Sequence, residues 1–338
     1  MTSSPAPTVL PQGPPCADVT AAFPQVHRYL GELLDDYRPD HAHLRGPLRT
    51  LVEQGRQAPH EFSLPLLVHA ALSGDPGPAV PVAAVHALWW RAANTFDDVA
   101  DGDAGPQLYG MPSAAALTAA LECGYALPLR ALASLPVPGP QRQGLIRDYL
   151  DGWTAASDGQ IGDLLNHPAG VEPQEVLHVY RHKSGSVYAM ACAMAARLAV
   201  GQERTEWAAA RIAAWTRFGQ LLGMLAQFRN DEDDLRSGRC EDLRNGTATY
   251  LLVHLVHSAP HGRRERVLAL LEASASSPES REELHAMMRE PGVVRPYHAH
   301  VASLREEAHT LLDTLAPECP YGTALRARVE YEVGFLQS

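Results

Sequence analysis

Cysteine and long apolar runs are both scarce in this chain of 338 residues. The five cysteines stand far apart, and none forms a Cys-x-x-Cys pair. This spacing argues against a disulfide framework and against a zinc site built from cysteines. No uninterrupted apolar stretch is long enough to cross a bilayer, and the first residues lack the basic and apolar segments of a secretion signal. These absences predict a cytoplasmic protein without a transmembrane segment.

Positive charge is also in deficit. The chain has 39 acidic and 28 basic residues, which give a formal net charge of −11 at pH 7. Because nucleic acids and anionic membranes attract basic surfaces, we expect neither as the principal partner. Hydrophobic residues make up 46% of the sequence, which is enough for a large buried core and excludes a wholly disordered chain.

Strand-like alternation of apolar and polar residues is scarce as well. Apolar residues instead recur three and four positions apart, as in Val26, Tyr29, Leu30, Leu33 and Leu34. This spacing, together with the abundance of alanine, leucine and arginine, predicts an all-α protein of roughly ten helices.

One helical domain with a flexible tail is the expected organisation. Residues 1–17 are rich in proline and serine and carry no charge, a composition that does not form a packed core. Residues 18–338 contain no linker and no repeat of fixed period, so we expect a single domain there. Within it, Ser113 and Ser277 are expected to cap helices, with Pro278 at the first helical position.

The segment FDDVAD closes a predicted helix with three carboxylates. Asp97 and Asp101 are four residues apart and therefore share a helix face, and Asn94 and Trp90 continue that face. Like charges at this spacing repel each other unless a cation lies between them. The segment, which also contains Asp98, is either an acidic helix end in solvent or part of a cation site.

A second acidic segment, QFRNDEDD, favours the cation site. Four polar residues fall on one helix face, at Gln227, Asn230, Asp231 and Asp234. Glu232 and Asp233 point elsewhere and are interpreted as structural. Amide and carboxylate oxygens without histidine or cysteine suit Mg²⁺, which binds phosphate oxygens as well. Two such faces opposite each other would hold a metal-bound diphosphate.

Lys183, in the segment RHKSGS, is the only lysine among the 28 basic residues. A compact ammonium kept in a chain that otherwise uses arginine indicates a point-charge contact to phosphate, although chance drift is the alternative. Upstream, the segment GQIGD places Gln160 and Asp163 one helical turn apart, with Trp153 on the face of Gln160.

In combination and order, these segments resemble the trans-isoprenyl diphosphate synthases, the polyprenyl synthetase family, over about residues 45–255. The similar segments are FDDVAD, GQIGD, HKSG, QFRNDEDD and DLRNGTAT. The resemblance implies an all-α helical bundle of the isoprenoid synthase type around a deep central cavity, usually as a homodimer. Aspartates from two facing helices would bind Mg²⁺, three ions in the family, and the diphosphate of an allylic isoprenyl substrate.

The resemblance also assigns roles to individual residues. The expected metal ligands are Asp97, Asp98, Asp101, Asn230, Asp231 and Asp234. Of these, the three first-segment aspartates and Asp231 would act in catalysis together with Lys183. The substrate would contact Lys183, Gln160, Gln227, Arg229, Asn94, Trp89, Ala92, Ala93, Phe96 and Trp153. For the aromatic residues, plain core packing is the alternative.

The helix before Asp97 is expected to limit the length of the substrate. In the family, the side chain five positions before the first aspartate forms a floor under the prenyl chain, and here that position is Ala92, followed by Ala93. Trp89 lies about 5 Å deeper, on nearly the same face. This arrangement implies a C15 or C20 substrate, unless another element sets the depth.

The sequence departs from the chain-elongating members at the isopentenyl diphosphate site. The family's GKRxRP frame retains Pro65, but its basic positions fall on Glu61, Phe62 and Leu64. The family's RRGxPT frame retains Gly110, Pro112 and Ser113, but Leu108 and Tyr109 replace its arginines. Each lost charge-assisted hydrogen bond is worth about 1.5–3 kcal/mol, so efficient use of isopentenyl diphosphate is not expected.

These departures favour a class I terpene synthase, which ionises one allylic diphosphate and cyclises or rearranges the cation. Asn230 in place of the family's first acid, giving NDxxD, is a step toward the metal-binding segment of terpene cyclases. The alternatives are a prenyltransferase with another acceptor and a chain-elongating isoprenyl diphosphate synthase. A non-catalytic partner subunit is disfavoured because it would not need both acidic segments.

Overall fold

The computed structural model describes residues 16–36, 41–54, 62–100, 105–201 and 205–337. Most of the predicted tail, Glu61 and Asp101 therefore lie outside the described residues. Residues 16 and 17, the end of the expected tail, adjoin or begin the first helix. The chain divides into two compact units, of which unit 1 comprises 1–150, 191–215 and 315–325, and unit 2 comprises 151–190, 216–314 and 326–338. Each unit is described by itself.

The prediction of an all-α protein is confirmed. In the described part of the chain, the only sheet is an antiparallel hairpin of two two-residue strands, β1 (Gln107–Leu108) and β2 (Met111–Pro112). There are more helices than the ten expected, because short helices such as α11 (Glu241–Asn245) are separated from their neighbours by glycine-containing turns.

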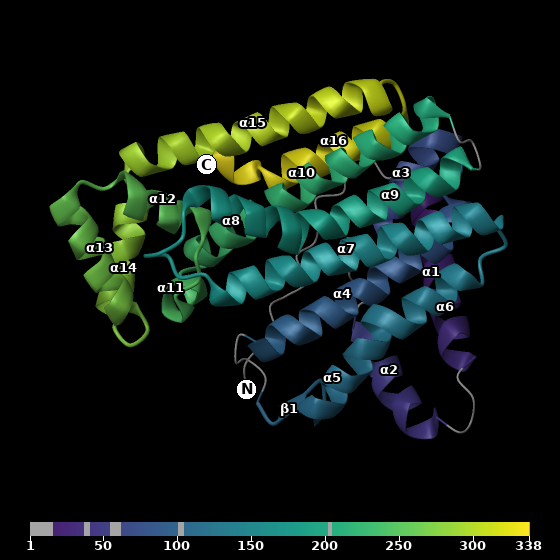
Figure 1. The fold of residues 1–338 in the computed structure, drawn as a ribbon, viewed down its shortest axis with the longest axis horizontal. Helices are drawn as coiled ribbons and strands as arrows, with labels where there is room; N and C mark the ends of the chain where they lie inside the picture. Colours follow the sequence, from purple (N-terminus) through teal and green to yellow (C-terminus); the bar gives the residue numbers. More distant parts are fainter. Residues whose placement is uncertain (1–15, 37–40, 55–61, 101–104, 202–204, 338) are drawn as a thin grey trace. The chain divides into compact units, whose positions relative to one another are not determined.

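Unit 1 contains the N-terminal helices. These are α1 (Ala17–Asp35), α2 (Ala42–Gln54), α3 (Ser63–Ser73), η4 (Gly77–Ala79), α4 (Val80–Ala100), α5 (Ser113–Leu121), η5 (Glu122–Ala126) and α6 (Leu127–Ala133). Helix α4 contacts α1, α2, α3, α5 and α6 (Figure 1). Its first turns, VPVAAVHALW, are buried almost without interruption, as expected of a helix that is apolar on all sides. Helix α4 is therefore the core of unit 1, and the first acidic segment forms its end.

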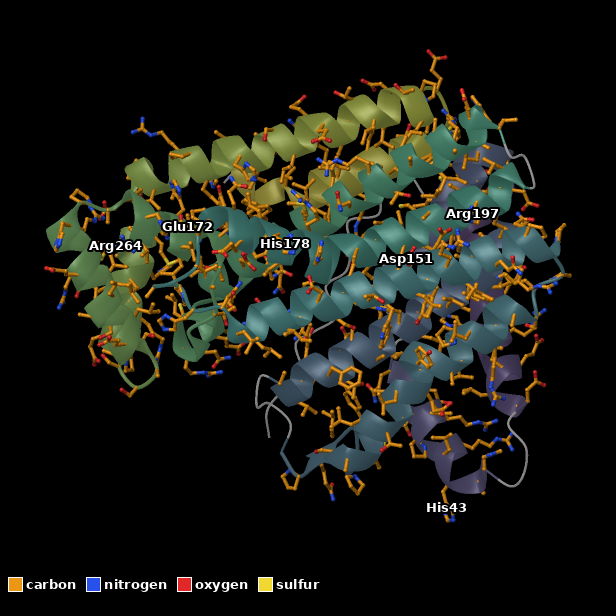
Figure 2. All side chains as sticks on the ribbon, in the orientation of Figure 1. His43, Asp151, Glu172, His178, Arg197 and Arg264 are labelled. Carbon is orange, nitrogen blue, oxygen red and sulfur yellow. The ribbon has the colours of Figure 1, made fainter. Side chains whose placement is uncertain are left out.

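Five helices carry residues of both units. They are α7 (Gly139–Leu165), α9 (Ser186–Val200), α10 (Glu206–Ser237), α15 (Pro291–Leu315) and α16 (Pro320–Glu332). Within unit 1, Arg197 on α9, which is labelled in Figure 2, donates two hydrogen bonds to Asp148 on α7, of 2.6 and 2.8 Å.

The remaining helices belong to unit 2. They are α8 (Pro173–Tyr180), η6 (Arg181–Gly185), α11, α12 (Tyr250–Ser258), α13 (His261–Ser274), α14 (Pro278–Met288) and η7 (Gly334–Gln337). Helices α13 and α14 pack together, and α12 contacts both of them and α8 (Figure 1). None of the helices in the described ranges has the length and apolar character that a membrane crossing requires.

Within unit 2, glycines bring α7 and α10 unusually close to the continuous segment formed by η6 and the start of α9. A Cβ atom on Gly159 of α7 would lie 2.1 Å from the backbone nitrogen of Lys183 in η6. A Cβ atom on Gly223 of α10 would lie 2.5 Å from the carbonyl oxygen of Ser184, and one on Gly219 would lie 2.4 Å from that of Tyr188. Because each gap is too small for any side chain, η6 is held between α7 and α10 by backbone contact.

Helix starts follow the sequence at one expected position and differ at another. The Ser277 side chain accepts a hydrogen bond from the Ser280 N–H at 3.0 Å and caps α14, which begins at Pro278 as predicted. Ser113 instead is the first residue of α5 and Pro112 is its N-cap, so the predicted cap is displaced by one residue. The Ser113 hydroxyl donates to the carbonyl of Gly105 at 2.6 Å, which fixes the chain entering the helix.

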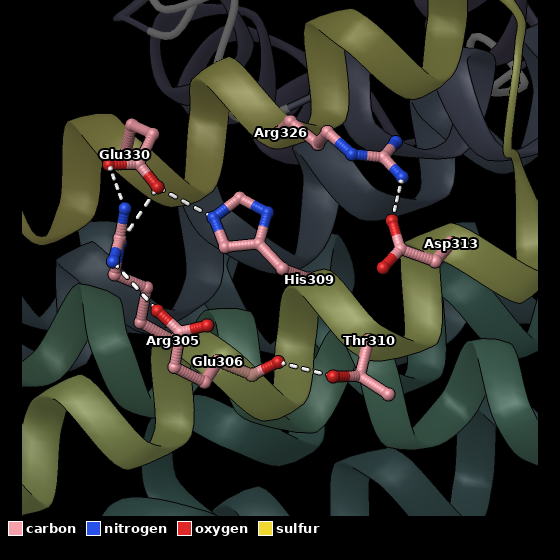
Figure 3. A network of polar contacts seen from close by, with 7 residues as sticks. All are labelled: Arg305, Glu306, His309, Thr310, Asp313, Arg326 and Glu330. Carbon is pink, nitrogen blue, oxygen red and sulfur yellow. Dashed lines mark hydrogen bonds and ion pairs between the residues drawn. The ribbon is translucent and has the colours of Figure 1, made fainter.

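An ion cluster joins α15 to α16 within unit 2. Glu330 accepts hydrogen bonds from Arg305, at 2.8 and 3.1 Å, and contacts His309 at 2.6 Å (Figure 3). Partial burial raises the pKa of the Glu330 carboxyl, but the hydrogen bonds from Arg305 and His309 outweigh burial and lower it overall. The cluster therefore stabilises the fold as long as Glu330 is ionised.

Candidate active site

The first acidic segment ends α4 in unit 1. Asp97 and Asp98 are half-buried, as are Phe96, which directly precedes them, and Asn94, about one turn earlier. They follow the buried part of the helix, so the segment lies where the core of unit 1 gives way to the surface. Asp101 lies outside the described residues, and its predicted role as a metal ligand stays a prediction.

Tyr109 reaches Asp98 from the β1–β2 hairpin. Its hydroxyl donates a hydrogen bond to the Asp98 carboxylate. Tyr109 has φ of 54° and Gly110 has φ of 78°, so the turn holds a bulky residue in the left-handed region. A tyrosine rarely adopts that conformation, and such residues cluster at functional sites. Burial, followed by the bond to Asp98, raises the pKa of Tyr109 to about 12, so the phenol remains a donor at neutral pH.

Arg91 is a charged residue of this site that sequence reasoning did not select. It lies on α4 seven residues before Asp98, a spacing of two helical turns that puts both on one face. Burial lowers the pKa of the guanidinium, against the opposing charges of Tyr109 and Asp98. The available signal was the single arginine of this helix, which interrupts the mainly apolar residues before the acidic end.

The residues predicted to form the substrate floor are largely buried in unit 1. Trp89 and Ala92 are buried and Ala93 is half-buried. Trp89 meets Trp90 edge-on, with ring centroids 5.3 Å apart. A small pocket in this unit is lined by other residues: His27, Leu30, Val52, Phe62, Ala87, Leu88 and Arg91. The predicted limit on chain length stays a prediction.

Core residues occupy the described positions of the segment that corresponds to the family's GKRxRP frame. Phe62 is only 1% exposed and meets Phe23 edge-on at 4.9 Å and His27 at 5.3 Å. Leu64 and Pro65 are buried too, at the start of α3. A phenylalanine held in this way offers no hydrogen-bond donor to a diphosphate.

Lys183 lies in unit 2 on η6, a turn of π-helix between α8 and α9. Such turns are rare and frequently occur at functional sites. The Lys183 ammonium contacts the Asp163 carboxylate of α7 at 2.7 Å, and both side chains are mostly buried. The structure thus joins two segments, HKSG and GQIGD, that the sequence analysis singled out separately. The sequence predicts no role for Asp163, although its i+3 spacing places it one helical turn from Gln160.

Asp231 is the centre of a buried polar cluster on α10. Its carboxylate accepts hydrogen bonds from the Tyr180 hydroxyl and from the Gln227 amide, the latter at 2.9 Å. The Ser184 hydroxyl next to Lys183 donates to the Gln227 carbonyl at 2.6 Å. Burial and then the negative charge of Asp242 raise the pKa of the Asp231 carboxyl well above its ordinary range.

Tyr180 was not predicted from sequence, and it links the cluster to α12. Its hydroxyl donates to Asp231 and accepts the Tyr250 N–H at 2.8 Å. Burial, followed by the charge of Asp231, raises its pKa well above the ordinary value. Because it lies three residues before Lys183, its position one helical turn away was the only local signal.

The other members of the second acidic segment have different surroundings. Asp234 is buried, and its two oxygens accept the backbone N–H groups of Glu241 and Asp242 at 3.0 and 3.2 Å. It therefore caps α11, whereas Asn230 is exposed. Glu232 is buried against Arg236 and Arg289, at 3.2 and 3.1 Å.

Three predicted substrate contacts remain. Arg229 donates to the Tyr331 carbonyl at 2.7 Å and lies over the Tyr331 ring at 3.5 Å, so binding substrate would require it to leave α16. It also pairs with Asp233, which is exposed. Gln160 and Trp153 are half-buried on α7.

The donor set of each unit fits Mg²⁺. Asp97 and Asp98 in unit 1, and Asp231 with Gln227 in unit 2, offer oxygen atoms without nitrogen or sulfur ligands. Asp231 is a buried acid whose ionised form is opposed by burial and by Asp242, and a cation would relieve that opposition. Both carboxylates already accept two hydrogen bonds, but the donors to Asp231 are side chains that can rotate, whereas those to Asp234 are backbone N–H groups of α11. Asp234 is therefore the weaker candidate.

Solved structures of prenyl synthases share this fold. The geranylgeranyl pyrophosphate synthetase of Pyrococcus horikoshii matches with a TM-score of 0.77 and 18% identity, over 94% of this chain and 97% of that one. The decaprenyl diphosphate synthase of Rhodobacter capsulatus gives the same score and identity, over 96% and 100%. The Corynebacterium glutamicum geranylgeranyl pyrophosphate synthase, in complex with calcium and isoprenyl diphosphate, gives 0.77 and 19%, over 95% and 96%.

Sequence comparison identifies the family. No curated protein matches the chain. The family model of the polyprenyl synthetases matches residues 108–288, just over half of the sequence. This range holds GQIGD, HKSG, QFRNDEDD and DLRNGTAT, while the FDDVAD segment precedes it. The chain, with its all-α isoprenoid synthase fold, therefore belongs to the polyprenyl synthetase family.

Proposed function

We propose that the protein is a prenyltransferase that extends an allylic isoprenyl diphosphate with isopentenyl diphosphate. The observation that carries the proposal is the family match over residues 108–288. The similar structures named above, which are geranylgeranyl and decaprenyl diphosphate synthases, support the same activity. The comparisons thus favour the chain-elongating alternative over the terpene synthase that the sequence analysis placed first.

In this proposal, the chain's own groups bind and orient the diphosphate. Lys183 supplies a positive charge that Asp163 now partners, and release of that ion pair would let the ammonium approach a phosphate oxygen. Gln227 is oriented by Ser184 and Asp231, and Tyr180 fixes the Asp231 carboxylate. Tyr109 plays the corresponding part for Asp98.

Mg²⁺ is the proposed cofactor, as is general for this family. Its proposed ligands are Asp97, Asp98 and Asp231, with Asp101, Asn230 and Asp234 as further members of the set. The bound ions, three in the family, would neutralise the charge that develops on the leaving diphosphate. Residues such as Phe96 and Trp153 would exclude water from the resulting allylic cation.

A terpene synthase is the second candidate, because the two segments that correspond to the family's isopentenyl diphosphate site have no lysine or arginine at the family's basic positions. Phe62 is a core residue, Leu108 is apolar, and Tyr109 uses its hydroxyl on Asp98. An enzyme without a second diphosphate site would cyclise or rearrange the cation, or pass it to an acceptor without a diphosphate. Arg91, on the face of Asp98, is the basic residue that chain elongation could use in place of the lost arginines.

One experiment separates the candidates. The purified protein is incubated with Mg²⁺ and C10, C15 or C20 allylic diphosphate, with and without isopentenyl diphosphate, and the products are analysed by mass spectrometry. Prenyl diphosphates longer by C5 units, formed only with isopentenyl diphosphate, are the expected result. Hydrocarbons or alcohols formed equally without isopentenyl diphosphate would contradict chain elongation and indicate a terpene synthase.

A variant ties the reaction to Arg91. Arg91→Leu should raise the KM for isopentenyl diphosphate without changing that for the allylic substrate, while Arg130→Leu on α6 provides a matched arginine control. Equal elongation by both variants would show that another group binds the second diphosphate. The homodimer that the resemblance implies remains part of the proposal, and gel filtration with light scattering tests it. The cytoplasmic location predicted from the sequence also remains a proposal.

A further inference from the structure

Unit 2 carries a second group of metal-ligating side chains that the proposed reaction does not use. Asp158 on α7, His178 on α8 and His182 on η6 bring one ligand atom each to within 4.8 Å of one another. Figure 2 shows His178 on α8, where its side chain is exposed. Asp158 is exposed as well and His182 is half-buried, so the group is open to ions in solution.

We propose that Asp158, His178 and His182 form a binding site for a divalent transition metal ion. The carboxylate oxygen of Asp158 lies 2.7 Å from Nδ1 of His182 and 3.6 Å from Nε2 of His178. Ligand atoms about 2.0–2.2 Å from one ion lie roughly 2.8–3.6 Å from each other at octahedral or tetrahedral angles. The 3.6 Å separation lies at the upper end of that range and the 2.7 Å separation lies just below it, so Asp158 is placed to share an ion with either histidine. The two histidine ligand atoms lie within 4.8 Å of each other and would come together by side-chain rotation.

The arrangement of the two histidines supports the same conclusion. They are four residues apart and share a helix face, and their ring centroids are 4.0 Å apart. The Ser186 hydroxyl donates to the carbonyl of His182 and so anchors the backbone of one ligand. The backbone of His182 therefore stays in place when its side chain rotates, and Asp158 completes the set from the neighbouring helix.

The chemistry of the ligands selects the class of ion. Two imidazoles and one carboxylate suit Zn²⁺, Co²⁺, Ni²⁺ or Cu²⁺, whereas Mg²⁺ prefers oxygen ligands alone. Three protein ligands leave the remaining positions to water. This site is distinct from the oxygen-only groups proposed for Mg²⁺, and its existence does not depend on the activity of the enzyme.

A bound ion would brace the segment that carries Lys183. Gly159, next to Asp158, contacts the backbone nitrogen of Lys183, and Asp163 pairs with its ammonium. An ion bound by all three residues would replace the direct contact between Asp158 and His182 with metal–ligand bonds and would tie α8 to the same point through His178, one residue away from Lys183. We therefore expect slower amide hydrogen exchange in residues 178–185 when the ion is bound.

Cobalt titration provides the test, because Co²⁺ coordinated by protein ligands has visible absorption bands that report its ligands. The full-length protein is titrated with Co²⁺ in the presence of excess Mg²⁺, and stoichiometry is measured by equilibrium dialysis. His178→Ala and Asp158→Asn remove ligands from the exposed side of the group, so the fold should persist, as circular dichroism can verify. His261→Ala is the matched control, since His261 is exposed and pairs with a carboxylate, that of Glu265, at 3.4 Å.

The expected result is one Co²⁺ per chain in the wild type and in the His261→Ala variant, without the intense bands of thiolate coordination. Each ligand variant should bind at least about tenfold more weakly, because even removal of supporting groups costs metal sites about 10–100-fold. Equal affinity in all four proteins, thiolate bands, or displacement of Co²⁺ by Mg²⁺ would each overturn the proposal. So would unchanged hydrogen exchange in residues 178–185 at saturation.

Discussion

Gly159→Ala tests whether backbone contact between α7 and η6 positions Lys183. The added Cβ atom would lie 2.1 Å from the Lys183 nitrogen and 2.6 Å from the His182 carbonyl carbon, whereas ordinary van der Waals contact begins at 3.4 Å. Both neighbours are backbone atoms and cannot rotate away. The two helices must therefore separate by more than 1 Å, which places this substitution among the severe cases of overpacking.

The magnitude follows from two opposing effects. Overpacking costs about 1–3 kcal/mol, and we expect the upper end because the contact is backbone to backbone. Alanine in place of glycine within a helix returns about 1 kcal/mol. The free energy of unfolding should therefore fall by about 2 kcal/mol. Separation of the helices also displaces Lys183, and a misplacement of about 1 Å can lower a reaction rate by about 100-fold.

Gly31→Ala is the matched control. Gly31 lies inside α1 of unit 1, and a Cβ atom there would meet nothing within 4 Å. This variant should gain up to about 1 kcal/mol in free energy of unfolding and keep its activity. Urea unfolding monitored by circular dichroism measures the stability, and diphosphate release from an allylic substrate measures the activity. The contact has no positioning role if Gly159→Ala is as stable and as active as Gly31→Ala.

Three further predictions concern charge, pH and substrate length. Asp97→Ala and Asp231→Asn should each reduce diphosphate release by more than about 100-fold, because each removes a proposed metal ligand. Thermal stability should stay equal or rise, because Asp97→Ala removes a repelled negative charge and Asp231→Asn a buried one. Full turnover by either variant would contradict the metal-site assignment. Glu330→Gln should lower the free energy of unfolding at pH 7 by less than about 1 kcal/mol, since the ion cluster is partly exposed. The pKa of the Glu330 carboxyl is lowered from the ordinary 4.5 in the folded protein. The stability difference between wild type and variant, measured by urea unfolding, should therefore vanish as the pH falls through this lowered pKa. A stability difference that persists in acid would refute its ionic origin. Ala92→Phe should shift kcat/KM toward C10 or C15 diphosphates and Trp89→Ala toward longer ones, and an unchanged order in both would exclude this helix as the floor.

The sequence alone determined the features that depend on helix periodicity. Apolar residues at three- and four-residue spacing define an all-α chain, and the i, i+4 spacing of Gln227 and Asp231 places their side chains in contact, as observed at 2.9 Å. Ser277 followed by Pro278 specifies a helix start by local backbone chemistry. The single lysine also marked Lys183, which the structure places in a rare π-helical turn.

Only the tertiary structure decided which groups meet across helices. Tyr109 reaches Asp98 over 11 residues, Lys183 reaches Asp163 over 20, and Tyr180 reaches Asp231 over 51. Helical periodicity fixes the face on which each side chain lies, but the partner depends on which helices pack together and how closely. At Gly159 the distance between α7 and η6 depends on the absence of a side chain. Glycine has no Cβ atom, so the backbones of α7 and η6 can come into contact there.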